Sequence, residues 1–399
     1  MTNTLITSMT PLKIKDNEQK KALNAWAKAG FKGSIIAGTG FGKSRCGVLA
    51  AAHVLKEYGG TGLILVPTTQ LQKQFREEFL KWGKEEALDS LDIICYQSAH
   101  KLRGKHYSIV ICDEVHLGLS PIYRRFFTNN MFDKLLCMTA TIPEEDEYRK
   151  LLVNLAPINY LVSLDKCVEL GLVAPYEIYC VPVSMTEEET KAYKEANDLF
   201  VKAQYKLGDP NNNFRDAFTN AQMVISGRRS GDKAAARDFY KGIRDRKTVV
   251  QHAVIKKECA KTIISEYVDK KVLVFSGSNA FTDEMAEHLD GIAYHSGKSK
   301  KKREGILEEF KSGENKILCS TKALNQGFDS PDSEVGIIAG LESKALPMIQ
   351  RIGRLLRLSE DKIGKIYILY VQDSQEEKWL KNAVLNLNNI NWLNSIDDV

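Results

Sequence analysis

Two short apolar runs, far apart in the chain, each lead into residues that a buried strand would deliver to the edge of a sheet. The run Ser34-Ile-Ile36 precedes the glycine-rich segment Ala37–Ser44, which ends in Gly-Lys-Ser. The run Ile109–Cys112 precedes Asp113-Glu114. The carboxyl ends of parallel strands meet at one edge of a doubly wound sheet, where such folds bind ligands. The two runs therefore predict a parallel α/β sheet with a ligand site formed by both segments.

The alternation of strand and helix patterns predicts two such sheets in tandem. In residues 33–140, short apolar runs alternate with amphipathic stretches such as 43–56 and 69–82. A second set of apolar runs, again mixed with helical patterns, occupies residues 271–369. Continuous apolar runs between helices are typical of parallel sheets that are covered on both faces. The fold class expected is α/β, with two open parallel sheets.

The region between the two sets is mostly helical in pattern. It starts at Thr186-Glu-Glu-Glu, an acidic first turn that the positive end of a helix favours. The length of 399 residues suits two domains. We expect domain 1 over residues 1–165 and domain 2 over residues 166–399, with the helical segment 186–269 inserted at the start of the second.

Charge and cysteine usage narrow the class of protein further. The net charge is +5, yet residues 228–261 carry eleven Lys or Arg against four Asp or Glu. A local basic face fits a polyanion such as a nucleic acid, although a solvated helical surface has the same composition. The eight cysteines form no close pairs, which predicts reduced, buried thiols. No leader or membrane-spanning run is found, so we expect a cytoplasmic protein of a bacterium or of a phage-infected host, without a membrane partner.

The glycine-rich segment predicts a site for a nucleoside triphosphate. Gly38, Gly40 and Gly42 allow the backbone to curl so that its N–H groups face phosphate oxygens. The helix that begins near Lys43 adds its positive end, and the Lys43 ammonium would reach the β- and γ-phosphates. The Ser44 hydroxyl would bind Mg²⁺.

The carboxylates after the second run supply the remaining chemistry of hydrolysis. Asp113 would hold the Mg²⁺ through water, and Glu114 would orient and deprotonate the attacking water. The alternative is a solvent-exposed acidic turn after a core strand. Positive charge for the transferred phosphoryl would come from Arg354 and Arg357, which share one face of a predicted helix with Gln350. An exposed basic helix is the alternative there.

With these residues in view, the chain resembles a superfamily 2 helicase or translocase of the DExH type, which has two RecA-like domains. The resemblance covers residues 19–357, and its motifs follow the family order. Asp113-Glu-Val-His116 with Gly353-Arg354-Leu-Leu-Arg357 is closer to XPB-like and phage UvsW-like DNA helicases than to DEAD-box RNA helicases. The motifs, from I to VI with Ia second, are Ala37–Ser44, Leu65–Gln74, Asp113–His116, Thr139–Thr141, Val274–Ser276, Ser320–Asp329 and Gln350–Arg357.

The resemblance implies roles for further residues. Residues expected to bind the nucleotide are Gln19, Ala37, Gly38, Thr39, Gly40, Phe41, Gly42, Lys43, Ser44, Gly327 and Asp329. Residues expected to contact nucleic acid are Thr68, Gln97, Ser98, Ser276 and Thr321, and the basic segment adds Arg228, Arg229, Arg237 and Arg244. Residues expected to couple the two sites are His116, Thr139 and Thr141, with His116 facing Gln350.

One position departs from the family pattern. Many members have an arginine three residues before the glutamine that reads adenine, but this chain has Asp16 at that distance from Gln19. The preference for ATP over other triphosphates is therefore left open by the sequence.

The function expected is that of an ATP-dependent DNA helicase or translocase, with ATP and Mg²⁺ as cofactors. Its partners would be single-stranded, duplex or branched DNA, in replication, recombination or repair, including branch migration and fork processing. The sequence leaves three alternatives: a duplex translocase that does not unwind, such as a restriction-system motor; an RNA helicase; and a nucleic-acid clamp timed by ATP.

Overall fold

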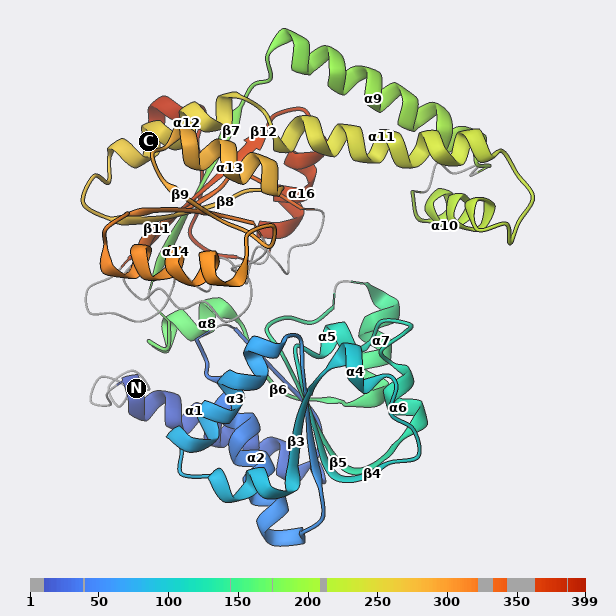
Figure 1. Ribbon diagram of the computed structural model, residues 1–399, viewed down its shortest axis with the longest axis vertical. Helices are drawn as coiled ribbons and strands as arrows, with labels where there is room; N and C mark the ends of the chain where they lie inside the picture. The colour runs from blue at the N-terminus through green and yellow to red at the C-terminus, as the bar shows by residue number, and fades with distance from the viewer. Residues whose placement is uncertain are drawn as a thin grey trace, which may run out of the picture. The chain divides into compact units, whose positions relative to one another are not determined.

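The computed structural model describes residues 11–38, 40–143, 145–173, 175–208, 214–321, 333–342, 363–385 and 387–399. The described chain divides into two compact units, and the change from the first to the second falls between Tyr176 and Glu177. Each unit is built on its own sheet (Figure 1). The prediction of two α/β domains in tandem is confirmed.

The first unit contains a six-stranded sheet with the order β3-β2-β4-β5-β1-β6, in which all pairings are parallel. Its strands are β1 (Lys32–Ala37), β2 (Gly62–Val66), β3 (Leu91–Cys95), β4 (His106–Asp113), β5 (Met131–Thr139) and β6 (Ile158–Val162). Its helices are α1 (Pro11–Lys28), α2 (Lys43–Tyr58), α3 (Thr69–Lys81), η2 (Glu85–Ser90), α4 (Tyr96–Ala99), α5 (Val115–Gly118), α6 (Arg125–Asn129), α7 (Asp146–Leu155) and α8 (Leu164–Glu169).

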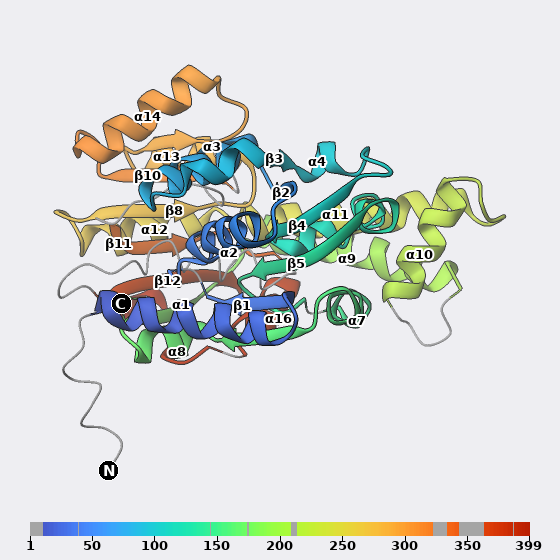
Figure 2. The same cartoon turned by 90° about the horizontal axis from the view of Figure 1, so that it is seen from below.

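Helices cover both faces of this sheet because its central strands are apolar on both sides (Figures 1 and 2). On one face, Val110 and Cys112 of β4 pack in a cluster with residues of α4, α6 and α7. On the other, Gly47 of α2 lies close to Ile111 and Met138, since a Cβ at this glycine would come within 3.5 Å of both side chains.

The second unit contains a seven-stranded sheet with the order β13-β7-β12-β11-β8-β10-β9. The pairings of β8 with β10 and β11, of β9 with β10, of β11 with β12 and of β7 with β13 are parallel. Its strands are β7 (Tyr176–Val183), β8 (Lys271–Phe275), β9 (Ile292–Tyr294), β10 (Ile317–Ser320), β11 (Ser333–Ile338), β12 (Gly364–Val371) and β13 (Ile390–Trp392). Helices that accompany it are α12 (Ile255–Ser265), α13 (Asn279–His288), α14 (Lys300–Ser312), α16 (Gln375–Val384) and the 3₁₀ turn η4 (Ile396–Asp398).

Three further helices of this unit extend away from its sheet and form a separate layer, which we call the arm (Figures 1 and 2). They are α9 (Glu187–Lys206), α10 (Phe214–Ile225) and α11 (Lys233–Gln251). The first helix begins after Thr186, as its acidic first turn predicts, and a capping box joins Thr186 and Glu189. The arm has a small core of its own, which includes Phe200, Ala221 and Phe239.

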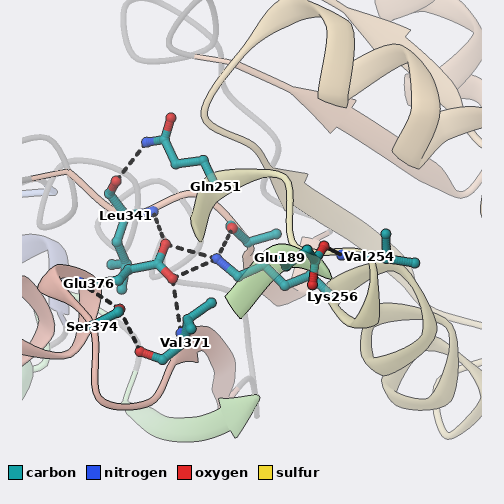
Figure 3. Close-up of polar contacts among 9 residues, drawn as sticks. Glu189, Gln251, Val254, Lys256, Leu341, Val371, Ser374 and Glu376 are labelled. Atoms are coloured by element: carbon teal, nitrogen blue, oxygen red, sulfur yellow. Dashed lines mark hydrogen bonds and ion pairs between the residues drawn. The ribbon is translucent and has the colours of Figure 1, made fainter. Parts of the chain in front are cut away.

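A buried ion pair lies at the ends of β11 and β12 in the second sheet (Figure 3). Both side chains, Lys256 of α12 and Glu376 of α16, are inaccessible to solvent. The Lys256 Nζ donates to both Glu376 oxygens, at 2.8 and 2.7 Å, and to the carbonyl of Ala339 at 2.8 Å. The carboxylate also accepts the backbone N–H groups of Leu341 (3.2 Å) and Val371 (3.0 Å). The pair therefore fixes the ends of β11 and β12 by main-chain hydrogen bonds.

All eight cysteines are buried free thiols, as predicted. Burial raises the pKa of Cys46 to about 12, so this thiol beside the glycine loop stays protonated. Among the described helices, none combines the length and the apolar character that a bilayer span requires.

Candidate functional site

The glycine loop follows β1 directly and ends where α2 begins. Gly40 and Gly42 have φ values of 92° and 86°, in the left-handed region that glycine tolerates best. Gly42 is the residue before the first turn of α2, and a Cβ placed on it would lie 2.4 Å from Gln19 Nε2. The loop conformation therefore depends on glycine at this position.

Lys43 opens α2 and lies mostly inside the loop, with 9% of its surface exposed. Its Nζ donates a hydrogen bond of 2.7 Å to the carbonyl of Ala37, at the end of β1. Ser44 follows it in the first turn and is half-buried. The ammonium is therefore held at the mouth of a loop whose curved backbone suits phosphate oxygens.

The two carboxylates lie at the end of β4, as predicted. Asp113 is 6% exposed. Burial raises its pKa to about 7, the adjacent Glu114 carboxylate adds to the rise, and the Lys43 ammonium opposes it. The opposing effect of Lys43 means that the loop lysine and this carboxylate share one electrostatic environment.

Glu114 has a backbone conformation that is rare for a side chain of its size. Its φ is 48°, and it precedes the short helix α5. Strained non-glycine residues of this kind gather at functional sites, where the surrounding structure holds them. The left-handed conformation of Glu114 turns the chain after Asp113. The Asp113 side chain is buried, whereas that of Glu114 is partly exposed.

A triangle of polar side chains links the end of β4 to the end of β5. The Thr139 hydroxyl donates to Glu114 Oε2 at 3.4 Å. His116 Nδ1 lies 3.3 Å from the Thr139 hydroxyl and 3.5 Å from Glu114 Oε2. Thr139 is fully buried in β5, which lies between β4 and β1 in the sheet. For the Thr141 hydroxyl, no hydrogen bond is found in the part of the chain that the structure describes.

A second cluster, which the sequence did not reveal, surrounds Gln19. Its Nε2 donates to the carbonyls of Phe41 (2.7 Å) and Gly42 (3.3 Å), while its Oε1 accepts from Arg45 Nη1 at 2.7 Å. Arg45 also pairs with Asp16, and its guanidinium lies 4.0 Å from the centre of the Trp82 ring. The hydrogen bond from Arg45 holds the pKa of Asp16 below its usual range.

This cluster includes Asp16, the position that departs from the family pattern. The family's arginine is absent before Gln19, but Arg45 of α2 supplies a guanidinium to the same glutamine. Asp16 is the partner of that arginine. The reversal of charge at position 16, together with an arginine two residues after Lys43, is the only signal in the sequence that could have suggested the exchange.

Candidate nucleic-acid residues of the first unit gather at the ends of β2 and β3. Thr68 follows β2 and caps α3, where its hydroxyl accepts the N–H of Leu71 at 3.4 Å. Gln97 and Ser98 follow β3 on α4, and both are exposed. The ends of β2 and β3 are paired, at Val66 with Cys95, so the two segments are neighbours.

Two nucleic-acid candidates of the second unit, Ser276 and Thr321, follow the adjacent strands β8 and β10. The Ser276 N–H donates to the carbonyl of Ser320 at 2.9 Å, next to Thr321. Ser276 is 1% exposed, and its hydroxyl bonds to Thr282 Oγ1 and to the carbonyl of Ser278 at 3.2 Å. The Ser276 hydroxyl is therefore engaged inside the turn. Thr321 is 8% exposed.

The four predicted arginines of the basic segment are all exposed on the arm. Arg228 and Arg229 follow α10, and Arg229 bonds to Asn220. Arg237 and Arg244 belong to α11. Six other predicted site residues lie outside the described residues: Thr39, Gly327, Asp329, Gln350, Arg354 and Arg357.

Two family models match successive parts of the chain. Residues 13–144 match "Type III restriction enzyme, res subunit", and residues 255–359 match "Helicase conserved C-terminal domain". The first match covers the glycine loop, the carboxylates and Thr139. The second covers four of the seven strands of the second sheet, β8 to β11.

Curated relatives match over most of this chain. The "DNA 3'-5' translocase XPB2" of Sulfurisphaera tokodaii is 27% identical over 85% of this chain and 77% of its own length. The "DNA 3'-5' helicase XPB" of Mycobacterium tuberculosis is 23% identical over 92% of this chain and 62% of its own length, and that of Kineococcus radiotolerans is 23% identical over 88% and 58%. The chain thus spans about three fifths of the length of these two helicases.

Solved structures support the fold. The Pyrococcus furiosus Hef helicase domain matches 92% of this chain and 97% of its own, with a TM-score of 0.53 at 18% identity. Saccharomyces cerevisiae Dbp5, bound to RNA and ADP BeF3, matches 96% of this chain and 90% of its own, with a TM-score of 0.58 at 14% identity. The fold is therefore that of the two-domain, RecA-like helicases.

The fold, the loop and the paired carboxylates define a P-loop protein of the helicase type. Together with the family models and relatives, they support the resemblance of the chain to superfamily 2 helicases and translocases. Within that superfamily the chain resembles the XPB-like DNA helicases, as its motifs predict.

Proposed function

We propose that this protein is an ATP-dependent DNA helicase or translocase, which hydrolyses ATP to move along DNA or to unwind it. The observation that carries the proposal is the arrangement at the sheet edge of the first unit. A glycine loop with Lys43, a strained Glu114 beside Asp113, and the hydrogen-bonded triangle with His116 and Thr139 occupy neighbouring strand ends. The relatives named as DNA helicases and translocases support DNA as the polymer.

The residues of this edge fit a triphosphate with its Mg²⁺ ion. Lys43 is a buried ammonium whose charge a phosphate oxygen would balance, and the backbone of Gly40 and Gly42 curves as a phosphate cradle requires. Asp113 is a buried carboxylate with a raised pKa, a state that a divalent cation would relieve. Ser44 and Asp113 would hold the ion, which neutralises phosphate charge when bound.

The protein side chains would then orient the reaction. Glu114 would position the attacking water and take its proton, because its carboxylate is held by Thr139 and lies near His116. Lys43 would steady the β- and γ-phosphates. Gln19 would contact the nucleotide base, with its amide oriented by Arg45. Cleavage of the phosphoanhydride passes the phosphoryl group to water, so positioning and charge are what the protein contributes.

Residues outside the described part complete the proposal on sequence grounds. Arg354 and Arg357 would neutralise charge on the transferred phosphoryl, and Gln350 would pair with His116. Gly327 and Asp329 would belong to the same nucleotide site. Arginines of this kind contribute roughly 10³–10⁵-fold in rate where they have been measured in other phosphoryl-transfer enzymes.

Nucleic acid would be held mainly through its phosphates, which fixes position without reading sequence. In the first unit, Thr68, Gln97 and Ser98 share one sheet edge. In the second, Thr321 would contact the strand. The Ser276 hydroxyl, engaged inside its turn, would take part only after that turn rearranges.

The basic segment on the arm would be an additional grip. Replacement of Arg228, Arg229, Arg237 and Arg244 by glutamine should weaken DNA binding. The dependence of the binding constant on salt should also flatten, since fewer counterions are released. An unchanged salt slope would reject this role.

We also propose that branched DNA is among the substrates, so that the protein would act in fork processing or branch migration during replication, recombination or repair. Its location would be cytoplasmic. A second candidate is a duplex translocase that does not unwind. The match of residues 13–144 to the restriction-enzyme subunit model favours it as the alternative.

The test measures ATP hydrolysis with single-stranded DNA, duplex DNA or RNA, beside strand displacement on forked and four-way DNA. We expect DNA to stimulate hydrolysis more than RNA and ATP to drive displacement. Both activities should be lost in Lys43→Ala and Glu114→Gln and kept in the exposed controls Lys84→Ala and Glu85→Gln. Hydrolysis without displacement would favour the non-unwinding translocase. Activity that survives in Glu114→Gln would contradict the proposal.

A further inference from the structure

The surface of the arm is more apolar than a solvated helical projection requires. Six large apolar residues that are at least 38% exposed lie within its helices α9 and α10, and they are Val201, Tyr205, Phe214, Phe218, Met223 and Ile225. Exposed apolar residues that cluster in this way mark interaction sites in soluble proteins.

Aromatic rings on α10 and α11 form one connected face within this surface. Phe214 is 49% exposed and Phe218 is 39% exposed. The centre of the Phe214 ring lies 6.0 Å from that of Phe218 and 5.8 Å from that of the buried Phe239. Phe218 in turn meets Tyr240 edge to face at 5.5 Å. The half-exposed rings are therefore fixed from behind by other rings, so that a ligand would bind them at little cost in side-chain entropy.

Cations flank this aromatic face at helical spacing. Arg237 and Arg244 lie three residues before and four residues after Tyr240 on α11, so all three share one side of the helix. Both arginines are exposed. By contrast, Arg246 stacks on Phe200 at 3.7 Å and bonds to Asn197, which makes it part of the packing of the arm.

The charge of the α10–α11 part of the arm agrees with this arrangement. Residues 214–251 hold nine Lys or Arg against four Asp or Glu, a net +5, whereas the whole arm, residues 187–251, has a net charge of +3. A polyanion is therefore the ligand that this face attracts best.

The combination of half-exposed rings with exposed arginines favours an unpaired strand over a duplex. A duplex offers its phosphates to cations but keeps the faces of its bases stacked inside. An unpaired strand offers both phosphates and base faces, and exposed rings bind the latter by stacking. Arginines alone would serve either form, whereas fixed, half-exposed rings beside them serve the unpaired strand.

From the ring contacts of Phe214, Phe218 and Tyr240 and the flanking Arg237 and Arg244, we propose that the α10–α11 face of the arm binds an unpaired nucleic-acid strand. The rings stack on its bases and the arginines pair with its phosphates. The inference rests on the proposed function and deepens it, because it assigns the arm to the single-stranded part of a fork or junction.

The test compares binding of the full chain to a 20-nucleotide single strand that contains 2-aminopurine and to a blunt duplex of the same length. The variant Phe214→Leu with Phe218→Leu keeps apolar side chains against the arm core and removes the rings. We expect its affinity for the single strand to fall about tenfold, from the loss of stacking. Its affinity for the duplex should stay within about twofold of wild type, and quenching of 2-aminopurine should weaken.

Two controls make the result specific. Tyr58→Ala removes an exposed ring from the first unit and should leave both affinities unchanged. The thermal unfolding curve of the double variant should match that of wild type. If the double variant is destabilised, the same binding measurements are made with Phe218→Leu alone.

The outcomes separate this inference from the proposed function. Equal loss for single strand and duplex, or no loss for either in a chain whose ATP hydrolysis DNA stimulates, would overturn the stacking role and leave the proposed function in place. No loss for either DNA would leave a protein partner as the occupant of the face. If the wild type binds neither DNA, both proposals fail.

Discussion

Removal of the buried cation Lys256 should destabilise the second unit strongly. The side chain is inaccessible, and it donates to both oxygens of Glu376 and to the Ala339 carbonyl. In Lys256→Met, a side chain of similar length fills the space but leaves the carboxylate without its counterion. Breaking a buried pair in this way costs about 3–5 kcal/mol in other proteins.

The lower end of that range applies here, because the carboxylate keeps two backbone donors, the N–H groups of Leu341 and Val371. We therefore expect Lys256→Met to lower the free energy of unfolding by about 3 kcal/mol. For a unit of this size, such a loss lowers the Tm by roughly 6–12 °C. The second variant, Glu376→Leu with Lys256→Met, should not recover stability, since it leaves those two buried N–H groups unpaired.

The assay is thermal unfolding followed by calorimetry, with the neighbouring residue as a matched control. Lys257 pairs with Glu284 at 3.3 Å near the surface, so Lys257→Met should cost at most about 1 kcal/mol. Equal shifts in Tm for Lys256→Met and Lys257→Met would refute the reasoning, because burial would then make no difference to the pair.

Two other changes test the candidate active site, and a third tests His252, a half-buried histidine at the end of α11 in the second unit. Gly42→Ala should raise the KM for ATP at least several-fold, because it forces alanine to a φ of 86° and its Cβ toward Gln19; an unchanged KM would show that the loop tolerates a side chain. Arg45→Met should reduce the preference for ATP over GTP, measured as the ratio of kcat/KM, since it releases the amide of Gln19; an unchanged ratio would separate Arg45 from base recognition. Burial lowers the pKa of His252 below the ordinary 6.5, so the folded state favours its neutral form and stability should fall as the pH drops below about 6.5. His252→Gln should make unfolding less dependent on pH over that interval, and an identical pH profile would exclude the histidine as its source.

Strands with mostly apolar sequences could be predicted from the chain alone. β2, β3 and β8 begin and end at the residues where the apolar runs do, Gly62–Val66, Leu91–Cys95 and Lys271–Phe275. β6 and β13 were not predicted. Both lie at sheet edges, where one side of a strand faces solvent and partly polar residues such as Asn159 and Asn391 interrupt the apolar pattern.

The candidate active site could be predicted as far as it depends on strand ends. Lys43, Asp113 and Glu114 follow buried strands directly, and parallel topology brings such positions to one edge. The cluster of Arg45, Asp16 and Trp82 could not be predicted, because the packing of α1 and α3 against α2 decides which side chains meet. The inward hydroxyl of Ser276 likewise depends on a turn that closes on Thr282.

The proposal that ATP cleavage drives movement on DNA is tested most directly by displacement of a third strand from a DNA triplex, a reaction that needs movement but no unwinding. The wild type should release the third strand only when ATP is present. Glu114→Gln should bind ATP and DNA yet release none, because its side chain cannot accept the proton of water. Release by Glu114→Gln at the wild-type rate would contradict the account, as would hydrolysis by the wild type with no release.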